Sequence, residues 1–314
     1  MAPRPRVALF VDQPDWHARH LTEAFAAHGA ETVCVSLKQC GFDTGAKHGL
    51  ILPGFADELP DGAFLRQISA GSFEQVTMRL GVLHALHELG VPVYNDARVT
   101  ERCVDKSMTS FLLQCRGVPT PPTWTVESFD RARAIARAEA RPSRPLVLKP
   151  LFGSQGCGLR LVDGASALPP VEEISGVFYL QRYVAGPSAG WHDWRVFVVG
   201  KRAVAAMIRH GVEWRTNAAR GARCEATPAT GELAELALAA ADAVGAGYAG
   251  VDIIADAQGR LQVLEVNSMP AWKALQRVSR VDIADALAAD FLARLRKAPE
   301  RRRRTAPARV VAGR

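Results

Sequence analysis

The chain has 314 residues, 48% of them hydrophobic and 23% charged, which indicates a folded globular protein of two or three domains and excludes a disordered or collagen-like chain. The net charge of +7 is confined to one end: nine basic residues lie beyond residue 293 against Glu300 alone, so this segment carries +8 and residues 1–293 carry −1. The neutral body argues against a nucleic-acid-binding protein, and we expect residues 297–314 to form a basic, disordered tail.

The first hundred residues alternate between strand and helix patterns. Strands are expected at residues 6–11, 32–37, 50–52 and 92–94, and amphipathic helices at 16–28 and 73–89. This alternation predicts a parallel sheet covered by helices. Because no GxGxxG motif is present, we expect no dinucleotide site in this amino-terminal α/β domain, which we place at residues 1–97.

The middle of the chain contains shorter elements separated by glycine and proline. Helices are expected at 105–115 and 127–140, and strands at 145–149, 158–162 and 178–184. Gly117 ends the first of these helices, and the prolines at 119, 121 and 122 prevent its continuation. We place a second domain at residues 98–186.

The last third of the chain predicts two strand pairs and two helices. Strands 194–199 and 203–208 form a hairpin around Gly200-Lys201, and strands 250–255 and 260–266 flank a turn. Helices are expected at 231–244 and 283–296. Strand-rich mixed segments of this kind indicate an α+β domain, residues 187–296, behind the α/β domain.

Three further features of the sequence bear on the cellular location of the protein. No apolar run approaches the roughly 18 residues needed to cross a bilayer, and the apolar stretch at 7–11 is too short for a signal peptide. The six cysteines are scattered without a CxxC or CxxH pair, which argues against a zinc site or a disulfide framework. We therefore expect a cytoplasmic protein with no membrane partner.

Two carboxylates and an amide lie in the second strand pair. Glu265 and Asn267 are two residues apart and point to one face of their strand, and counting outward from the turn places Asp252 opposite Val263, diagonal to Glu265 on that face. The residues expected to face the core are Val251, Ile253, Leu264 and Val266. Oxygen ligands on a rigid platform suit Mg²⁺, and unpaired charge within apolar strands is costly, so we favour a metal site over a surface hairpin with incidental acids.

A lysine and a glycine-rich loop follow the strand at 145–149. The loop residues Gly153, Ser154, Gly156 and Gly158 would let backbone N–H groups approach phosphate oxygens, while Lys149 supplies positive charge. The loop is not a Walker A motif, because Gly-Lys-Ser/Thr is missing. By itself it is equally consistent with an ordinary flexible turn.

A third set of residues is basic and polar. Arg195, Arg215 and Arg220 are spaced along a strand and the loop after it, and Asp193 and Asn217 lie two residues from Arg195 and Arg215 in the sequence. Arginines in this arrangement can bind anionic oxygens bidentately. In a chain this rich in arginine, solvated surface residues are the competing interpretation.

Taken in order, these motifs resemble those of the ATP-grasp superfamily, and most closely the RimK-like α-L-glutamate ligases. The residues that carry the resemblance are Asp105-Lys106, Lys149, the loop 153–158, Gln181-Arg182-Tyr183-Val184, Asp193-Trp194-Arg195, Arg215-Thr216-Asn217, Arg220-Gly221, Asp252 and Glu265-Val266-Asn267. The resemblance runs from about residue 98 to 293. It implies an ATP-grasp fold preceded by a Rossmann-like (pre-ATP-grasp) α/β domain.

The resemblance also implies a role for each residue. Those assigned to ATP are Lys106, Lys149, Gly153, Ser154, Gly156 and Gly158 at the phosphates, Gln181, Arg182 and Tyr183 in the hinge strand beside the adenine, Asp193 near the ribose, and Arg215, Thr216 and Asn217 at the triphosphate. Those assigned to catalysis are Arg220 and Arg195, and those assigned to Mg²⁺, with Mn²⁺ as an alternative, are Asp252, Glu265 and Asn267. The chain departs from the family pattern at Arg182, where glutamate is usual, and at residues 268–273.

The implied reaction forms an amide bond. ATP phosphorylates a substrate carboxylate, and an amine, from L-glutamate or another amino acid, displaces phosphate from the acyl phosphate. The acceptor is either a small cofactor precursor or a peptide or protein carboxyl terminus. Two other interpretations stay open: a non-catalytic ATP-binding protein, and a nucleic-acid-associated protein acting through its basic tail. The oligomeric state is also open, a homo-oligomer included.

Two tryptophans lie next to residues of the expected site. Trp214 precedes Arg215, and Trp272 follows Asn267 by five residues. Both are expected in polar loops, where an aromatic ring could stack on a flat acceptor. We therefore hypothesise a small acceptor with an aromatic or pterin-like ring, against the alternative that these tryptophans are core residues.

Overall fold

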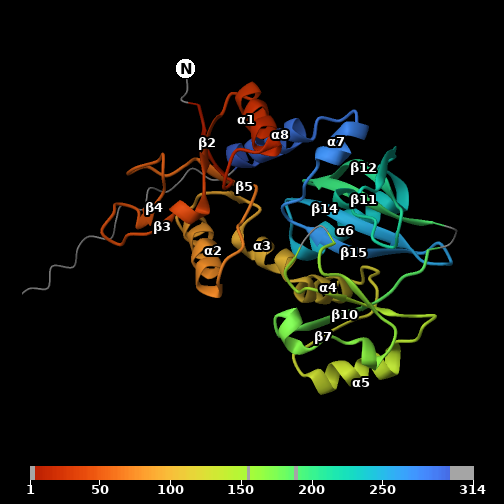
Figure 1. The fold of residues 1–314 in the computed structure, drawn as a ribbon. Coiled ribbons are helices and arrows are strands. Elements are labelled where there is room, and N and C mark those ends of the chain that lie inside the picture. The colour runs from red at the N-terminus through yellow and green to blue at the C-terminus, as the bar shows by residue number, and fades with distance from the viewer. Residues whose placement is uncertain (1–3, 154–155, 187–189, 298–314) are drawn as a thin grey trace, which may run out of the picture. The chain divides into compact units, whose positions relative to one another are not determined.

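The computed structural model describes residues 4–153, 156–186 and 190–297, and these divide into two units (Figure 1). One unit consists of the described residues of Met1–Arg98 and Asp282–Arg314, and the other is Val99–Val281. The division falls within α3 (Ala97–Val104), one residue from the boundary drawn from the sequence. The closing helix α8 (Ile283–Lys297) packs on α1 (Trp16–Ala27), so it groups with the amino-terminal unit and not with residues 187–281.

The amino-terminal unit contains the expected parallel sheet. Its strand order is β2-β1-β5-β6, with β1 (Arg6–Phe10), β2 (Glu31–Val35), β5 (Gly62–Leu65) and β6 (Val93–Tyr94). Its helices besides α1 and α8 include α2 (Phe73–Glu88), which begins with a capping box between Ser72 and Gln75. The mixed α/β fold class expected from the sequence is confirmed here.

The strand expected at 50–52 does not belong to that sheet. β4 (Leu50–Ile51) pairs with β3 (Gly41–Phe42) in a separate antiparallel hairpin. The third strand of the main sheet is β5, which is buried along its whole length and has too few residues to show a pattern. A Cβ on Gly62 would lie 2.7 Å from Phe291 Cζ of α8, so glycine is needed for this close packing.

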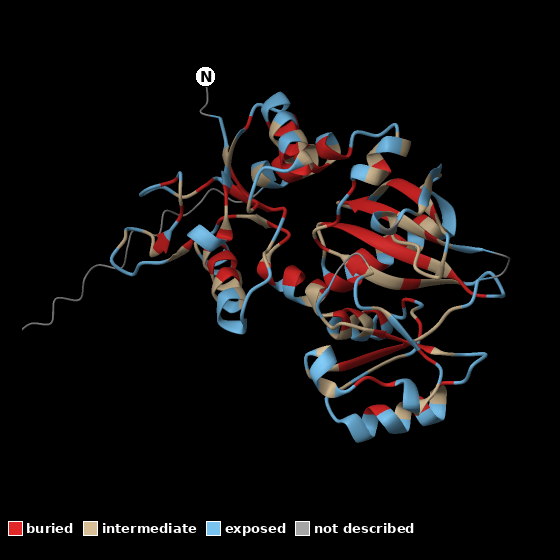
Figure 2. Cartoon of the chain, viewed as in Figure 1, coloured by how far each residue is buried: buried red, intermediate tan, exposed pale blue. Residues whose placement is uncertain are grey.

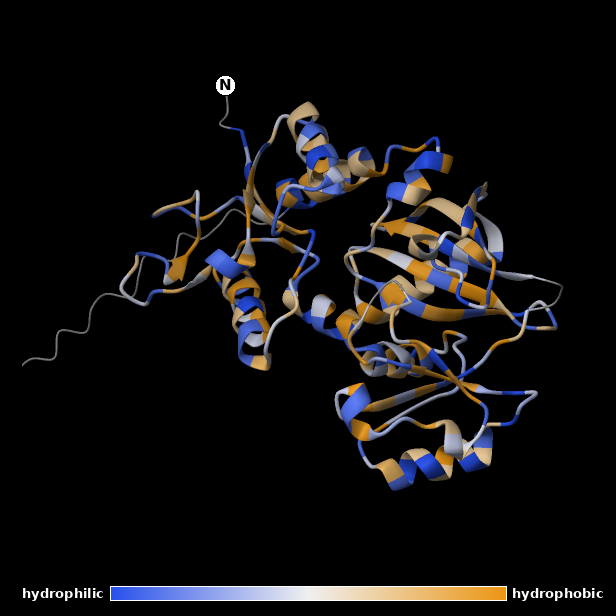
Figure 3. Cartoon of the chain, in the orientation of Figure 1, coloured by the Kyte–Doolittle hydropathy of each residue, from blue (hydrophilic) through white to orange (hydrophobic). Residues whose placement is uncertain are grey.

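The second unit contains two antiparallel sheets. The smaller has the order β7-β10-β8-β9, with β7 (Thr123–Val126), β8 (Leu146–Lys149), β9 (Arg160–Val162) and β10 (Phe178–Arg182). α5 (Phe129–Glu139) covers it through Ala132 and Ala136, while hydrophilic residues line much of the rest of this helix (Figure 3). Ser128 caps α5 by accepting from the backbone N–H of Arg131. The sequence had not predicted β7, whose four residues follow three prolines.

The larger sheet has five strands in the order β13-β12-β11-β14-β15. They are β11 (Trp191–Val199), β12 (Arg202–Gly211), β13 (Arg223–Thr227), β14 (Tyr248–Ala255) and β15 (Leu261–Asn267). The other helices of the unit are α4 (Lys106–Cys115), α6 (Gly231–Val244) and α7 (Lys273–Val278). β14 is buried along nearly its whole length, as Figure 2 shows. Over the described residues, no helix is long and apolar enough to cross a membrane.

Candidate active site

The five-stranded sheet has an apolar face and a charged face. Side chains such as Val196, Val251 and Val263 pack with the alanines of α6 in one hydrophobic cluster. The charged face carries residues from four neighbouring strands: Asp193 and Arg195 on β11, Arg209 on β12, Asp252 on β14 and Glu265 on β15. Because alternate residues of a strand point to opposite faces, one sheet serves both as the core of the unit and as a polar platform.

Irregularities of the strands set which charges meet. Asp252 lies opposite Glu265, and not opposite Val263 as expected, because the pairing begins one residue later, at Ala255 and Leu261, and a bulge between Asp252 and Ile253 adds a second residue. The partner differs by two residues, so Asp252 stays on the face predicted from the sequence. Leu264 was expected in the core but is only half-buried, and Val263 is the core residue instead.

A chain of ion pairs crosses three strands of this face. Arg195 donates to both oxygens of Asp252, from Nε to Oδ1 at 2.7 Å and from Nη2 to Oδ2 at 2.7 Å. Nη2 of Arg209 lies 3.2 Å from Oδ2 of the same carboxylate. Arg209 also donates to Asp193, from Nε to Oδ1 at 2.7 Å and from Nη2 to Oδ2 at 2.5 Å. Two arginines and two aspartates therefore alternate across the sheet.

Burial and ion pairing act in opposite directions on the pKa values of these groups. Burial would raise the pKa of Asp252, but the guanidiniums of Arg195 and Arg209 outweigh it and lower that pKa to about 2. Burial would lower the pKa of Arg209, and the carboxylates of Asp252 and Asp193 raise it above its ordinary value. Burial raises the pKa of Asp193, although the charge of Arg209 and the hydrogen bonds from Arg209 and from the hydroxyl of Thr216 oppose this effect. A contact of Asp193 with the ribose of ATP stays a prediction, since this carboxylate is already held within the sheet.

Lys149, at the end of β8, lies beside the charged face. Its Nζ donates to Oε1 of the buried Gln181 on β10 at 2.7 Å. Burial lowers the pKa of Lys149 to about 8 and the charge of Lys106 adds to this effect, while the carboxylates of Glu265 and Asp252 oppose it. An anionic ligand such as a phosphate would raise this pKa again and so favour the protonated lysine.

Lys106 holds the glycine-rich loop. It is the first residue of α4, after the N-cap Asp105, and its buried Nζ donates to the backbone oxygens of Leu151 (3.2 Å) and Gly153 (2.9 Å). Gly158 in this loop has a φ of +72°, and a Cβ there would lie 2.7 Å from Cγ of Pro150. Gly156 also has a positive φ, whereas Ser154 lies outside the described residues. Gly156 and Gly158 are thus required by the backbone of the loop.

The side chain of Arg182 turns toward α5. Its Nη2 donates to Oε2 of Glu139 at 2.5 Å, and its guanidinium carbon lies 5.9 Å from the centre of the Trp124 ring. The backbone N–H of the next residue, Tyr183, donates to the oxygen of Pro145. Arg182 therefore has a local structural partner, and contacts of the hinge strand with adenine stay predictions.

The loop after β12 brings an aromatic pair and an arginine together. The rings of Trp214 and Tyr183 meet edge to face at 6.3 Å, and the guanidinium carbon of Arg215 lies 4.9 Å from the centre of the Trp214 ring. Trp214 is half-buried. Asn217 precedes a short turn, and the side chain of Arg220 in that turn lies outside what the structure describes.

Trp272 does not occupy the polar surface expected from the sequence. Only 1% of it is exposed, and its ring packs edge to face on Phe197 at 5.9 Å. It is one of the largest fully buried side chains of the described residues. The hypothesis that Trp272 stacks on an acceptor is wrong, because the residues after β15 fold back into the core.

The expected metal ligands fit a hard divalent cation. Asp252 and Glu265 face each other across β14 and β15, and Nδ2 of Asn267 donates to the oxygen of Gly250 at 3.4 Å, which orients the amide oxygen away from that carbonyl. Within the described residues Glu265 forms no ion pair, and no group of three His, Cys, Asp or Glu side chains could hold a metal. Two carboxylates and one amide suit Mg²⁺, which takes few protein ligands and leaves other positions to phosphate and water.

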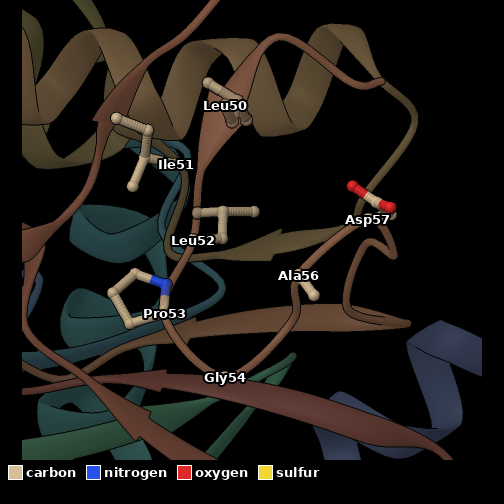
Figure 4. A pocket seen from close by; sticks show the side chains of 7 residues that line it. All are labelled: Leu50, Ile51, Leu52, Pro53, Gly54, Ala56 and Asp57. Atoms are coloured by element: carbon tan, nitrogen blue, oxygen red, sulfur yellow. The ribbon is translucent and has the colours of Figure 1, made fainter. Parts of the chain in front are cut away.

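A hollow elsewhere in the molecule is not connected with these residues. It lies beside β4 in the amino-terminal unit and is lined by Leu50, Ile51, Leu52, Pro53, Gly54, Ala56 and Asp57 (Figure 4). Its lining is largely aliphatic and contains none of the residues predicted for ATP, metal or acceptor. We therefore place the candidate active site on the charged face of the five-stranded sheet.

Comparison of the fold identifies the class. The ATP-grasp ligase PsnB, in a structure described as complexed with minimal precursor, Mg and ADP, superimposes with a TM-score of 0.71 over 94% of this chain and 99% of that chain, at 22% identity. The fold is therefore that of the ATP-grasp ligases.

The sequence identifies the family. The RimK-like ATP-grasp domain matches residues 103–291, so the chain belongs to the RimK-like ATP-grasp family and is an ATP-dependent carboxylate–amine ligase. It is 38% identical over 231 residues to the tetrahydromethanopterin:alpha-L-glutamate ligase of Methanococcus maripaludis, covering 72% of this chain and 76% of the relative. It is 31% identical over 208 residues to the alpha-aminoadipate–LysW ligase LysX of Saccharolobus solfataricus, covering 63% and 74%.

Proposed function

We propose that this ligase joins L-glutamate to a carboxylate of a small acceptor, in a reaction that passes through an acyl phosphate. The observation that supports the chemistry most directly is that Asp252 and Glu265 lie opposite each other on the five-stranded sheet and that their charges raise the pKa of the buried Lys149 at the end of β8. A magnesium nucleotide could be held from two sides here. The positive groups come from β8 and α4, and the acidic groups come from β14 and β15. Charge neutralisation of this kind accounts for much of the catalysis of phosphoryl transfer.

Each residue has a role in this proposal. Lys149 and Lys106 bind the phosphates of ATP, and Asp252, Glu265 and Asn267 hold Mg²⁺, which supplies charge neutralisation between the phosphates. Arg195, Arg215 and Arg220 stabilise negative charge on the transferred group, and the glycine-rich loop excludes water, to which an acyl phosphate would be lost. Mn²⁺ would be expected to substitute for Mg²⁺, because both accept oxygen ligands.

The proposed acceptor bears a flat ring. Trp214 is half-buried in the loop that follows β12, beside Tyr183 and Arg215, and offers an aromatic surface next to predicted nucleotide-binding residues. The 38% identical relative carries a name in which the acceptor is tetrahydromethanopterin, a molecule with a pterin ring. Both observations favour a ring-bearing small molecule, although Trp272 no longer supports it.

A second candidate is ligation to the carboxyl terminus of a peptide or protein. It is favoured by the likeness to LysX, whose name gives LysW as one of the two molecules that it joins, and by the fold shared with PsnB, one structure of which is described as complexed with a precursor peptide. The two candidates share ATP chemistry and differ only in the acceptor. The basic tail, for which a nucleic-acid role was weighed, lies outside the described residues apart from Lys297.

A product assay tests the proposal. The purified chain is incubated with ATP, MgCl₂ and L-glutamate together with tetrahydromethanopterin, with a peptide that has a free carboxyl terminus, or with no acceptor. We expect ADP release only with the first acceptor, a mass gain of glutamate residues on it, and transfer of an isotopically labelled carboxylate oxygen into the released phosphate. The Glu265→Gln variant is the inactive control. ADP release with the peptide alone would reject the small acceptor, and failure of the labelled oxygen to reach phosphate would reject the acyl phosphate.

A further inference from the structure

The carboxylate proposed to bind metal is already occupied by an arginine. Both oxygens of Asp252 accept hydrogen bonds from Arg195 at 2.7 Å, and the side chain of Asp252 is only 6% exposed. A cation bound between Asp252 and Glu265 needs at least one of those oxygens. Metal binding and the bidentate ion pair therefore compete for the same atoms.

The balance of charges on this face indicates what Arg195 does before the nucleotide binds. Asp193, Asp252 and Glu265 contribute three negative charges, against which Arg195 and Arg209 contribute two positive ones. Buried negative charge in excess of positive charge is costly, so Asp252 needs a cation besides Arg209, which it shares with Asp193. The guanidinium of Arg195 supplies that positive charge in the arrangement seen here.

Of the two arginines, one is fixed and the other is free to leave. Arg209 bridges two carboxylates and its side chain is 3% exposed, so its departure would leave Asp193 without an ion-pair partner. Arg195 is 14% exposed, and Asp252 is its sole ion-pair partner within the described part of the chain. If Arg195 leaves, Asp252 still has the contact to Arg209 and gains the metal.

We propose that Arg195 is an exchangeable counter-ion of the metal site: it neutralises Asp252 in the nucleotide-free enzyme and is displaced when Mg²⁺ arrives with ATP. The inference rests on the proposed metal role of Asp252 and Glu265. The displaced guanidinium then becomes available to the anionic oxygens of the nucleotide. Arg209, which sequence analysis did not single out, is the positioning residue that keeps Asp252 and Asp193 in place throughout the exchange.

The exchange has a functional consequence for the order of binding. Because the metal must displace an ion pair, metal alone binds weakly, whereas metal together with nucleotide offers Arg195 new anionic partners and binds well. The two ligands are therefore coupled through one side chain. Arg195 reaches the transferred group only when the site is loaded.

Metal binding provides the test, with Mn²⁺ alone as the paramagnetic probe and its free concentration measured by electron paramagnetic resonance. We expect Arg195→Met to bind Mn²⁺ roughly tenfold more tightly than the unmodified chain, because the competing charge-assisted hydrogen bonds are gone. Arg195→Lys should show a smaller gain. Arg260→Met is the matched control, since Arg260 also pairs with an aspartate, Asp256, but is 75% exposed. Glu265→Gln should lose Mn²⁺ binding.

The outcomes separate this inference from the proposed function. Unchanged or weaker Mn²⁺ binding by Arg195→Met, with binding still lost in Glu265→Gln, overturns the exchange and leaves the metal site standing. Mn²⁺ binding retained by Glu265→Gln overturns the metal site and the exchange with it.

A measurement on the unmodified chain covers the case in which Arg195→Met does not fold. In nitrogen-15 arginine spectra, assigned with Arg195→Lys, the Nε–H of Arg195 should be protected from solvent exchange, and its resonance should shift when MgADP is added, because its hydrogen-bond partner changes. The Nε–H of Arg209 should stay protected. A resonance of Arg195 that stays unchanged in saturating MgADP overturns the exchange.

Discussion

Replacing Lys149 with methionine should stabilise the nucleotide-free protein while abolishing its response to ATP. Burial lowers the pKa of this lysine from 10.5 to about 8, which corresponds to a cost of about 3 kcal/mol for keeping it protonated in the folded state. Methionine removes this cost, but the variant also loses the hydrogen bond to Gln181, which lowers the gain in stability by about 1 kcal/mol. The net gain of about 2 kcal/mol should raise the melting temperature of the unit Val99–Val281 by roughly 5 °C at neutral pH.

The stability gained by Lys149→Met should depend on pH. Below about pH 8 the lysine is protonated in both states, and the folded state bears the full cost. Between about pH 8 and 10.5 the folded state has released the proton and the unfolded state has not, so the cost disappears as the pH rises. The advantage of Lys149→Met should therefore be present at pH 7 and shrink toward pH 10.

Calorimetric melting at pH 7 and pH 10, with and without MgATP, checks the reasoning. The matched control is Lys201→Met, which removes an exposed lysine at the β11–β12 turn and should change neither the melting temperature nor the ATP response. MgATP should raise the melting temperature of the unmodified chain and leave Lys149→Met unchanged. A Lys149→Met variant that melts below the unmodified chain at pH 7, with a difference that pH does not alter, would refute the argument.

Three further predictions follow from individual contacts. Glu265→Gln and Asp252→Asn should both abolish turnover, but Asp252→Asn should also lower the melting temperature by several degrees, because it leaves Arg195 without a charged partner and Arg209 with Asp193 alone; equal melting temperatures would contradict the ion-pair network. Arg182→Glu should destabilise the chain by placing like charges together, and Glu139→Arg in the same chain should restore stability; no rescue in the double variant would show that the pair contributes nothing. Trp272→Ala should cost about 3–5 kcal/mol in urea unfolding, whereas Trp214→Ala should raise the acceptor KM several-fold with little change in stability; an unchanged acceptor KM in Trp214→Ala would remove this ring from the acceptor site.

Much of the fold could be predicted because its elements have strong local patterns. The alternation of strands and helices in the first hundred residues predicted the parallel sheet, and Gly200-Lys201 correctly marked the hairpin between β11 and β12. Short elements such as β5 and β7 were missed, since four residues do not establish a period. Their strand character comes from neighbours distant in sequence.

The candidate site, too, was predicted in part from the sequence. The motifs predicted most residues of the site. The two-residue period of the strands correctly placed Asp252, Glu265 and Asn267 on one face. It could not find Arg209: a bulge between Phe197 and Val198 shifts the register and sets Arg209 opposite Asp193, where an unbroken hairpin would put Ile208.

By itself, then, the sequence determined the fold class, the family and the chemical types gathered at the site, because these depend on local periodicity and on motifs that are read along the chain. The tertiary structure decided which charges meet and which side chains are buried. Two bulges paired Arg209 with Asp193 and Glu265 with Asp252, and the fold-back after β15 buried Trp272 against Phe197. Register and burial depend on packing between segments far apart in the chain, and that information is not present in any one of them.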